Sequence, residues 1–189
     1  MQPTDSPVSS TAAPEVEGMS AAFRDVHGRP LHGFALLLTL GKRPVAARLT
    51  NRALTASTRR LDELRHPERA AAWLRAEVLR HAPRARTALR PGPAAIRALG
   101  ELGAEPLVVM ALRALTTRER AALIASDVER LDPRDVGTII GADGASLERL
   151  ITRARARYAH AFVSLGDHEP VTSGPLTAKI QAATERALR

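Results

Sequence analysis

Apolar residues recur at helical spacing in the C-terminal half of the chain, between residues 131 and 162. Val136, Ile139 and Ile140 predict a short helix, which Asp132 would cap and Pro133 would begin. After a break at residues 141–143, the pattern predicts a second, longer helix that Asp143 can cap. Its apolar stripe consists of Leu147, Leu150, Ile151, Ala154, Tyr158, Ala161 and Phe162. The stretch therefore predicts two helices joined by a tight turn.

The opposite side of the second predicted helix is polar and basic, and carries Ser146, Arg149, Thr152, Arg153 and Arg157. A short helix, a glycine-containing turn and a basic helix are typical of a helix-turn-helix, whose second helix enters the major groove of DNA. An αα-hairpin in any helical bundle has the same pattern. Both interpretations stay open on this stretch alone.

The N-terminal half also shows helical spacing. Residues 1–19 are rich in Ser, Thr, Pro and Ala and predict a disordered tail. A helical pattern then runs from Ser20 to Leu40, and we expect a kink or two short helices at Gly28–Pro30. Gly41 ends this element. Further helices are expected over residues 44–61 and from Pro67 to just before Pro83.

Prolines and glycines concentrate between the two halves. Residues 83–106 hold four prolines and three glycines, which predict a linker containing a short helix over residues 94–102. Beyond it, Thr116 and Glu119 match a capping box that begins a helix through residues 121–128. We therefore predict an all-α protein with two small domains, residues 20–82 and 107–165. Residues 166–189 would form a C-terminal tail or a weak helix.

Composition and charge narrow the possible functions. Apolar residues make up 44 % of the chain, enough for a core, and aromatic residues only 3 %. The net charge is +8, and residues 42–90 hold 13 Lys or Arg against 4 Asp or Glu. Such a basic block suits a polyanion or an acidic protein surface, although a merely solvated surface has the same composition. The absence of cysteine excludes disulfides and thiolate metal sites.

The sequence offers little for catalysis or for membrane insertion. The six histidines lack paired metal-ligand spacing, and neither a nucleophile-elbow motif nor a glycine-rich phosphate loop is present. Residues 167–169 (Asp-His-Glu) could chelate an ion, but an exposed polar turn explains them better. No run of 18 apolar residues exists, and the acidic N-terminus is unlike a signal peptide. We expect a cytoplasmic protein that is not an enzyme, has no cofactor and does not bind a membrane.

Several motifs together resemble a known family. Residues 114–123, 129–137 and 140–141, followed by the basic helix through Arg155, resemble region 4 of the extracytoplasmic-function sigma factors. On its own this segment is also similar to the LuxR-type response-regulator domain. In the N-terminal half, residues 23–41 resemble the first part of sigma region 2, and residues 59–62 and 72–74 resemble its later helices. The resemblance covers residues 20–160.

This resemblance implies a transcription-initiation protein that binds DNA and the RNA polymerase core, and that an anti-sigma or other regulatory protein could control. The face of the second helix that would meet DNA consists of Ala145, Ser146, Glu148, Arg149, Thr152, Arg153 and Arg157. Arg149 would read a base, and Arg153 and Arg157 would contact phosphates. Glu148 would either accept from a cytosine amino group or repel phosphate.

Departures from the family pattern favour an alternative. The family carries an acidic, polymerase-binding cluster where this chain has residues 45–52, which include Arg48, Asn51 and Arg52 and no carboxylate. The loop over residues 63–67, which matches the family's base-capturing loop, offers only His66 for stacking, and all five aromatic residues lie on apolar faces. The alternative is a degenerate sigma-like regulator or protein-interaction module that no longer supports initiation.

Overall fold

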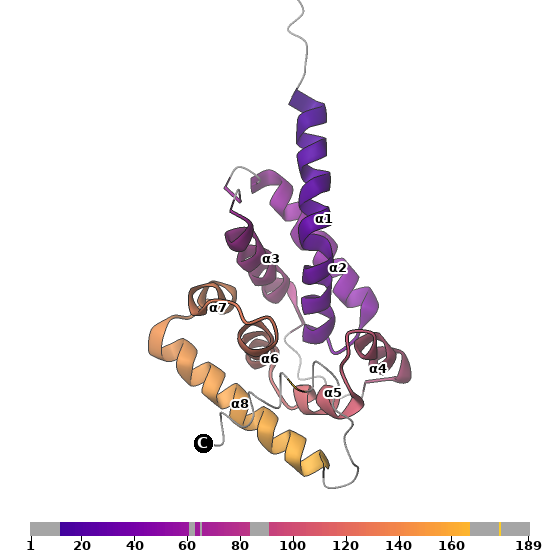
Figure 1. The fold of residues 1–189 in the computed structure, drawn as a ribbon, viewed down its shortest axis with the longest axis vertical. Helices are drawn as coiled ribbons and strands as arrows, with labels where there is room; N and C mark the ends of the chain where they lie inside the picture. Colours follow the sequence, from indigo (N-terminus) through magenta and orange to yellow (C-terminus); the bar gives the residue numbers. More distant parts are fainter. Residues whose placement is uncertain (1–11, 61–62, 65, 84–90, 167–177, 179–189) are drawn as a thin grey trace, which may run out of the picture.

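In the computed structural model, the described residues are 12–60, 63–64, 66–83, 91–166 and 178, and every regular element within them is helical (Figure 1). These elements are α1 (Ala12–Leu38), α2 (Arg43–Ser57), the 3-10 turn η1 (Thr58–Arg60), α3 (Pro67–His81), α4 (Pro93–Gly100), α5 (Pro106–Arg113), α6 (Thr117–Leu123), the π-helical turn η2 (Ile124–Val128), α7 (Pro133–Ile140) and α8 (Gly144–Gly166). The predicted all-α class is confirmed. None of these helices is both long and apolar enough to span a membrane.

Helix α1 is longer than the sequence pattern predicts. It begins at Ala12, inside the expected tail, and the rest of that tail lies outside the described residues. Two alanines favour helix, and Pro14 falls in the first turn, where a missing N–H costs nothing. The helix also continues through Pro30, so two separate helices are not formed. Pro30 is exposed, and beyond it Leu31, Phe34 and their neighbours are buried, which anchors the second half of the helix.

Gly41 ends the first element as predicted and also allows α4 to approach. Its φ of +77° lies in the left-handed region that favours glycine. A Cβ on Gly41 would lie 2.2 Å from the backbone oxygen of Ala95 in α4. The chain then turns into α2, whose Ala46, Leu49 and Leu54 are buried.

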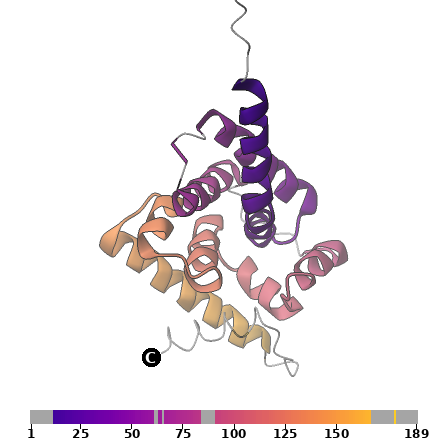
Figure 2. The same ribbon diagram turned by 45° about the horizontal axis from the view of Figure 1, so that its top comes forward.

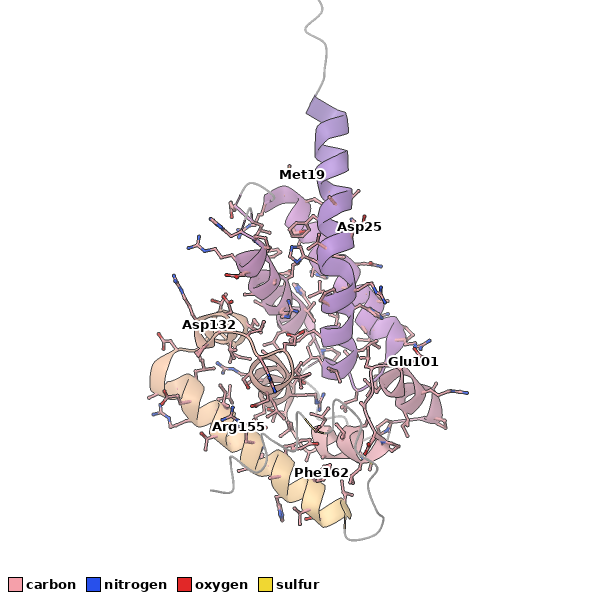
Figure 3. All side chains as sticks on the ribbon, in the orientation of Figure 1. Met19, Asp25, Glu101, Asp132, Arg155 and Phe162 are labelled. Carbon is pink, nitrogen blue, oxygen red and sulfur yellow. The ribbon has the colours of Figure 1, made fainter. Side chains whose placement is uncertain are left out.

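The predicted linker contains a helix that belongs to the core. Helix α4 lies within one residue of its expected start and two of its expected end, and its Ala98 and Leu99 are buried. Arg43 at the start of α2 forms an ion pair with Glu101 at the end of α4 (Figure 3). The segment over residues 91–106 therefore packs against the N-terminal helices. Residues 84–90 lie outside the described part of the chain.

The capping box that begins α6 is confirmed. The Thr116 hydroxyl accepts a hydrogen bond from the Glu119 amide, and the Glu119 carboxylate accepts one from the Thr116 amide at 2.9 Å. The helix predicted through residues 121–128 changes at Ile124 into the π-helical turn η2. After this wider turn, the Leu131 amide donates a hydrogen bond back to the carbonyl of Ala125 within η2, just before α7 begins.

The N-terminal and C-terminal halves share one hydrophobic core, which differs from the expected pair of domains separated by a linker. Buried side chains from α1 through α8 form one cluster, and α3 lies beside α7 in both views (Figures 1 and 2). Arg75 of α3 binds Glu129 through two hydrogen bonds of 2.6 and 2.9 Å. The buried guanidinium of Arg120 donates to the Leu38 carbonyl at the end of α1. These contacts join residues far apart in the sequence, so local patterns could not reveal them.

Candidate nucleic-acid interface

Helix α7 and the turn after it form as the sequence predicts. The Asp132 carboxylate caps α7 by accepting a hydrogen bond of 2.8 Å from the Arg134 amide (Figure 3). Val136, Ile139 and Ile140 are buried. Gly141 ends the helix with a φ of +66°, a left-handed conformation that glycine adopts without steric cost. This conformation of Gly141 lets the chain reverse its direction sharply between α7 and α8.

The predicted apolar stripe anchors α8 against α5 and α6 (Figure 1). Leu147, Ala154 and Tyr158 are buried, and the remaining members are half-buried against the same core: Leu150, Ile151, Ala161 and Phe162. Asp143 stands just before the helix, and its backbone carbonyl accepts from the amides of residues 146 and 147. The rotation of α8 about its axis is therefore fixed by packing.

The seven residues predicted to face DNA are all exposed. They are Ala145, Ser146, Glu148, Arg149, Thr152, Arg153 and Arg157, and we call them the outer face of α8. The structure thus brings them together on one helix surface, while their contact with DNA stays a prediction. A helix presented in this way can enter a groove without rearranging its own core.

Two acidic side chains, Glu119 and Asp127, form ion pairs with most of the arginines of α8. Arg157 lies 3.1 Å from Glu119, and Arg153 lies 3.9 Å from the same carboxylate. Arg155 binds the buried Asp127 at 2.8 Å (Figure 3). An arginine that is already paired must exchange one anion for another before it binds phosphate. The predicted phosphate role of Arg157 is therefore weakened.

Glu119 remains an anion at neutral pH. Burial alone would raise its pKa, but hydrogen bonds from Thr116 and the charge of Arg157 outweigh burial and lower the pKa. The capping box identified Glu119 as a helix-start residue, but nothing in the local sequence pattern signalled its second role. The pairing with Arg157 joins residues 38 positions apart.

Arg149 differs from the other three arginines of α8. Its guanidinium is exposed, and its hydrogen-bond partner among the described residues is the neutral Ser146 hydroxyl, at 3.2 Å. Because no carboxylate in that part of the chain neutralises it, Arg149 keeps its full charge for an external anion or base. Among the predicted DNA contacts it is the best placed.

A cleft of about 590 Å³ lies between the starts of α7 and α8. Its charged lining consists of Arg134, Asp143 and Glu148. With two carboxylates and one guanidinium, the lining is negatively charged overall and would repel a phosphate. Close approach of DNA here would need donors on the bases, such as a cytosine amino group, rather than backbone phosphate alone.

The predicted polymerase-binding residues lie elsewhere. Arg48, Asn51 and Arg52 are exposed on α2, which the structure does not bring together with the outer face of α8 (Figure 1). The predicted core role of the aromatic residues is confirmed. Phe34 and Tyr158 are buried, while Phe23, Trp73 and Phe162 are half-buried against the core. Base stacking therefore has no exposed aromatic platform among the described residues.

No group of three or more metal-ligating side chains occurs within the described part of the chain, and the Asp-His-Glu segment over residues 167–169 lies outside it. No protein-family model matches this chain, and comparisons with curated proteins and with solved structures find no match. Its function must therefore be argued from the surfaces described above.

Proposed function

We propose that this chain is a DNA-binding transcription-initiation protein similar to the extracytoplasmic-function sigma factors, acting in the cytoplasm with the RNA polymerase core. The observation that supports it most is the outer face of α8, with its seven exposed residues and the unneutralised Arg149. The apolar stripe fixes this face outward, as a helix that reads a groove requires.

Residues at the start of α8 would read bases, since a recognition helix contacts base edges mainly from its N-terminal end. Arg149 would pair with guanine in a bidentate contact, and Glu148 would accept from a cytosine amino group. Ser146 and Thr152 would donate to bases or phosphates, and Ala145 would allow the backbone to approach closely. Arg153 would contact phosphate more readily than Arg157, because it is 61 % rather than 44 % exposed and lies farther from Glu119.

Two observations favour the alternative, a sigma-like regulator or interaction module that no longer supports initiation. The buried Arg75–Glu129 pair and the common core hold the two halves together, which restricts their independent movement. Helix α2 also exposes arginines where the family offers polymerase an acidic cluster. Weak or absent polymerase binding together with retained DNA binding would select this alternative.

Selection of binding sites from a random duplex library with the full chain tests the DNA proposal. The parent should enrich one motif, and Arg149→Ala should relax the preference at one base pair, worth about 1–3 kcal/mol. Arg69→Ala on α3, also exposed, is the matched control and should leave the motif unchanged. No enriched motif in the parent, with Arg149→Ala indistinguishable from it, would reject DNA reading by α8. A pull-down with core polymerase then separates initiation from the alternative.

A further inference from the structure

Helix α2 and the turn η1 after it present a row of arginines that no other part of the described chain neutralises. Arg48, Arg52 and Arg59 are exposed, and none has a carboxylate partner within that part of the chain. Asn51 and Thr55 are exposed between them. We call these five residues the arginine row. Several other arginines do have carboxylate partners: Arg43, Arg60, Arg75, Arg80, Arg153, Arg155 and Arg157.

The arginine row occupies the side of α2 opposite its buried side. Residues 48, 52 and 55 follow each other at intervals of four and three, so they fall on one face of α2, and Arg59 follows in η1. The buried side of α2 contacts α1: the Thr50 hydroxyl lies 3.4 Å from His32, and Leu54 packs near Gly28. Packing therefore holds the row toward solvent. Neither α2 nor η1 contains an acidic residue.

The composition of the arginine row fits a nucleic-acid backbone better than a protein. A protein interface is centred on apolar or aromatic anchors, and the row contains none. Nucleic-acid interfaces are polar and strongly basic, and guanidinium, amide and hydroxyl donors are the groups that bind phosphate oxygens. From Arg48 to Arg59 the row spans about 16 Å along the helix. Because each strand winds around the duplex axis, a straight row meets only part of it, and we expect about one phosphate contact for each of the three arginines.

We infer that the arginine row is a second nucleic-acid-binding surface, which holds the phosphate backbone of a duplex without reading its sequence. Since α2 and α8 lie on different sides of the molecule in both views, this duplex segment differs from any segment that α8 reads (Figures 1 and 2). The family resemblance assigns three of these residues, Arg48, Asn51 and Arg52, to polymerase, and the inference gives them a different partner. It rests on α2 and η1 and does not depend on the function proposed for α8.

The test measures binding of the full chain to a labelled 20-base-pair duplex of mixed sequence by fluorescence anisotropy across a salt series. The row variant is Arg48→Gln/Arg52→Gln/Arg59→Gln. The control, Arg24→Gln/Arg69→Gln/Arg97→Gln, removes the same charge from exposed arginines on α1, α3 and α4. Both variants must match the parent in helical circular dichroism and thermal midpoint. A row variant that fails this check is replaced by Arg48→Gln/Arg52→Gln, whose slope should fall by about 1.8, and the control by Arg24→Gln/Arg69→Gln.

The slope of log affinity against log salt should fall by roughly 2.7 in the row variant, which is about 0.9 for each lost phosphate contact. It should fall by less than one in the control. Affinity at 50 mM salt should drop about tenfold or more in the row variant. Equal losses in both variants would show a general effect of net charge and overturn the inference, as would an unchanged row variant.

Two further measurements separate the remaining possibilities. Polyglutamate with as many charges as the duplex should compete only weakly. If it competes as well as DNA, the row serves an acidic protein and the inference is overturned. Repeating the salt series in an Arg149→Ala/Arg153→Ala background should retain the loss caused by the row variant. A row effect that persists when site selection finds no motif would reject the function proposed for α8 and leave this inference standing.

Discussion

Glu119 shows how one side chain can serve two parts of the structure. Its carboxylate closes the capping box of α6 and also holds Arg157 on α8, and it comes within 3.9 Å of Arg153. Only the first role could be predicted from the sequence, because a capping box is defined by residues three positions apart. The second role depends on how α8 crosses α6, which no local pattern contains.

Removing the charge of Glu119 should therefore strengthen DNA binding. Glu119→Gln keeps a side chain that can complete the capping box, but frees Arg157 and Arg153 for phosphate. We expect higher affinity for mixed-sequence duplex and a salt slope steeper by about one to two units, measured by anisotropy. Glu119→Ala should add a lower thermal midpoint, since it also removes the cap. An unchanged slope in Glu119→Gln would mean that α8 does not approach phosphates.

Among the elements, those defined by local signals were predicted most closely. Asp132, Pro133 and Gly141 act where capping and turn chemistry require them, and α7 lies between them as expected. The π-helical turn η2 was not predicted, because it is a single turn of five residues and such turns are rare. The continuation of α1 through Pro30 was not predicted either, since it depends on the burial of later residues such as Leu31 and Phe34 in the tertiary core.

The junction between α1 and α2 should tolerate no side chain at Gly41. Gly41→Ala would force a left-handed conformation on alanine and push its Cβ into the backbone of Ala95. We expect a loss of at least about 2 kcal/mol in the free energy of unfolding, measured by urea denaturation. Gly33→Ala in α1 is the control. Nothing lies within 4 Å of the added Cβ there, so a gain of up to about 1 kcal/mol is expected. Equal stability of the two variants would contradict the close approach of α4.

At the scale of the whole molecule, the two halves could be predicted separately but their union could not. Two contacts form only after α1, α3 and α6 have packed. One joins Arg75 to Glu129, and the other joins Arg120 to the Leu38 carbonyl. Their residue types are common on helix surfaces, so the sequence shows no reason to pair them. The same holds for the pairing of α3 with α7, which places a helix of the N-terminal half against the first helix of the candidate site.

His27 should make the stability of the folded chain sensitive to acid. Burial and then the charge of Arg75 lower the pKa of His27 below its ordinary value of 6.5. In the unfolded chain the imidazole takes up a proton as the pH falls through 6.5, whereas in the folded chain it resists protonation until lower pH. Stability should therefore decrease as the pH falls below about 6.5. His27→Gln should flatten this part of a thermal-midpoint profile between about pH 7.5 and 5, and an unaltered profile would contradict the assignment.

A shared core further predicts that the chain unfolds as one cooperative unit. Trp73 is the single tryptophan and lies on α3, so its fluorescence reports on the N-terminal half, while far-ultraviolet circular dichroism follows all the helices. The two urea transitions should coincide. Separate transitions would instead restore the two independent domains that the sequence pattern predicted.

The Arg75–Glu129 pair provides the sharpest version of this test. Its side chains are only 7 % and 18 % exposed, so removing one partner leaves a buried charge without its counterion. Glu129→Gln should cost about 3 kcal/mol. The double variant Arg75→Met/Glu129→Leu should recover much of that loss, because apolar side chains of similar size replace both charges. Arg43→Gln, which breaks the exposed pair with Glu101, should change stability little. If Glu129→Gln were as mild as Arg43→Gln, the ion pair would not contribute to holding the halves together, and the common core alone would join them.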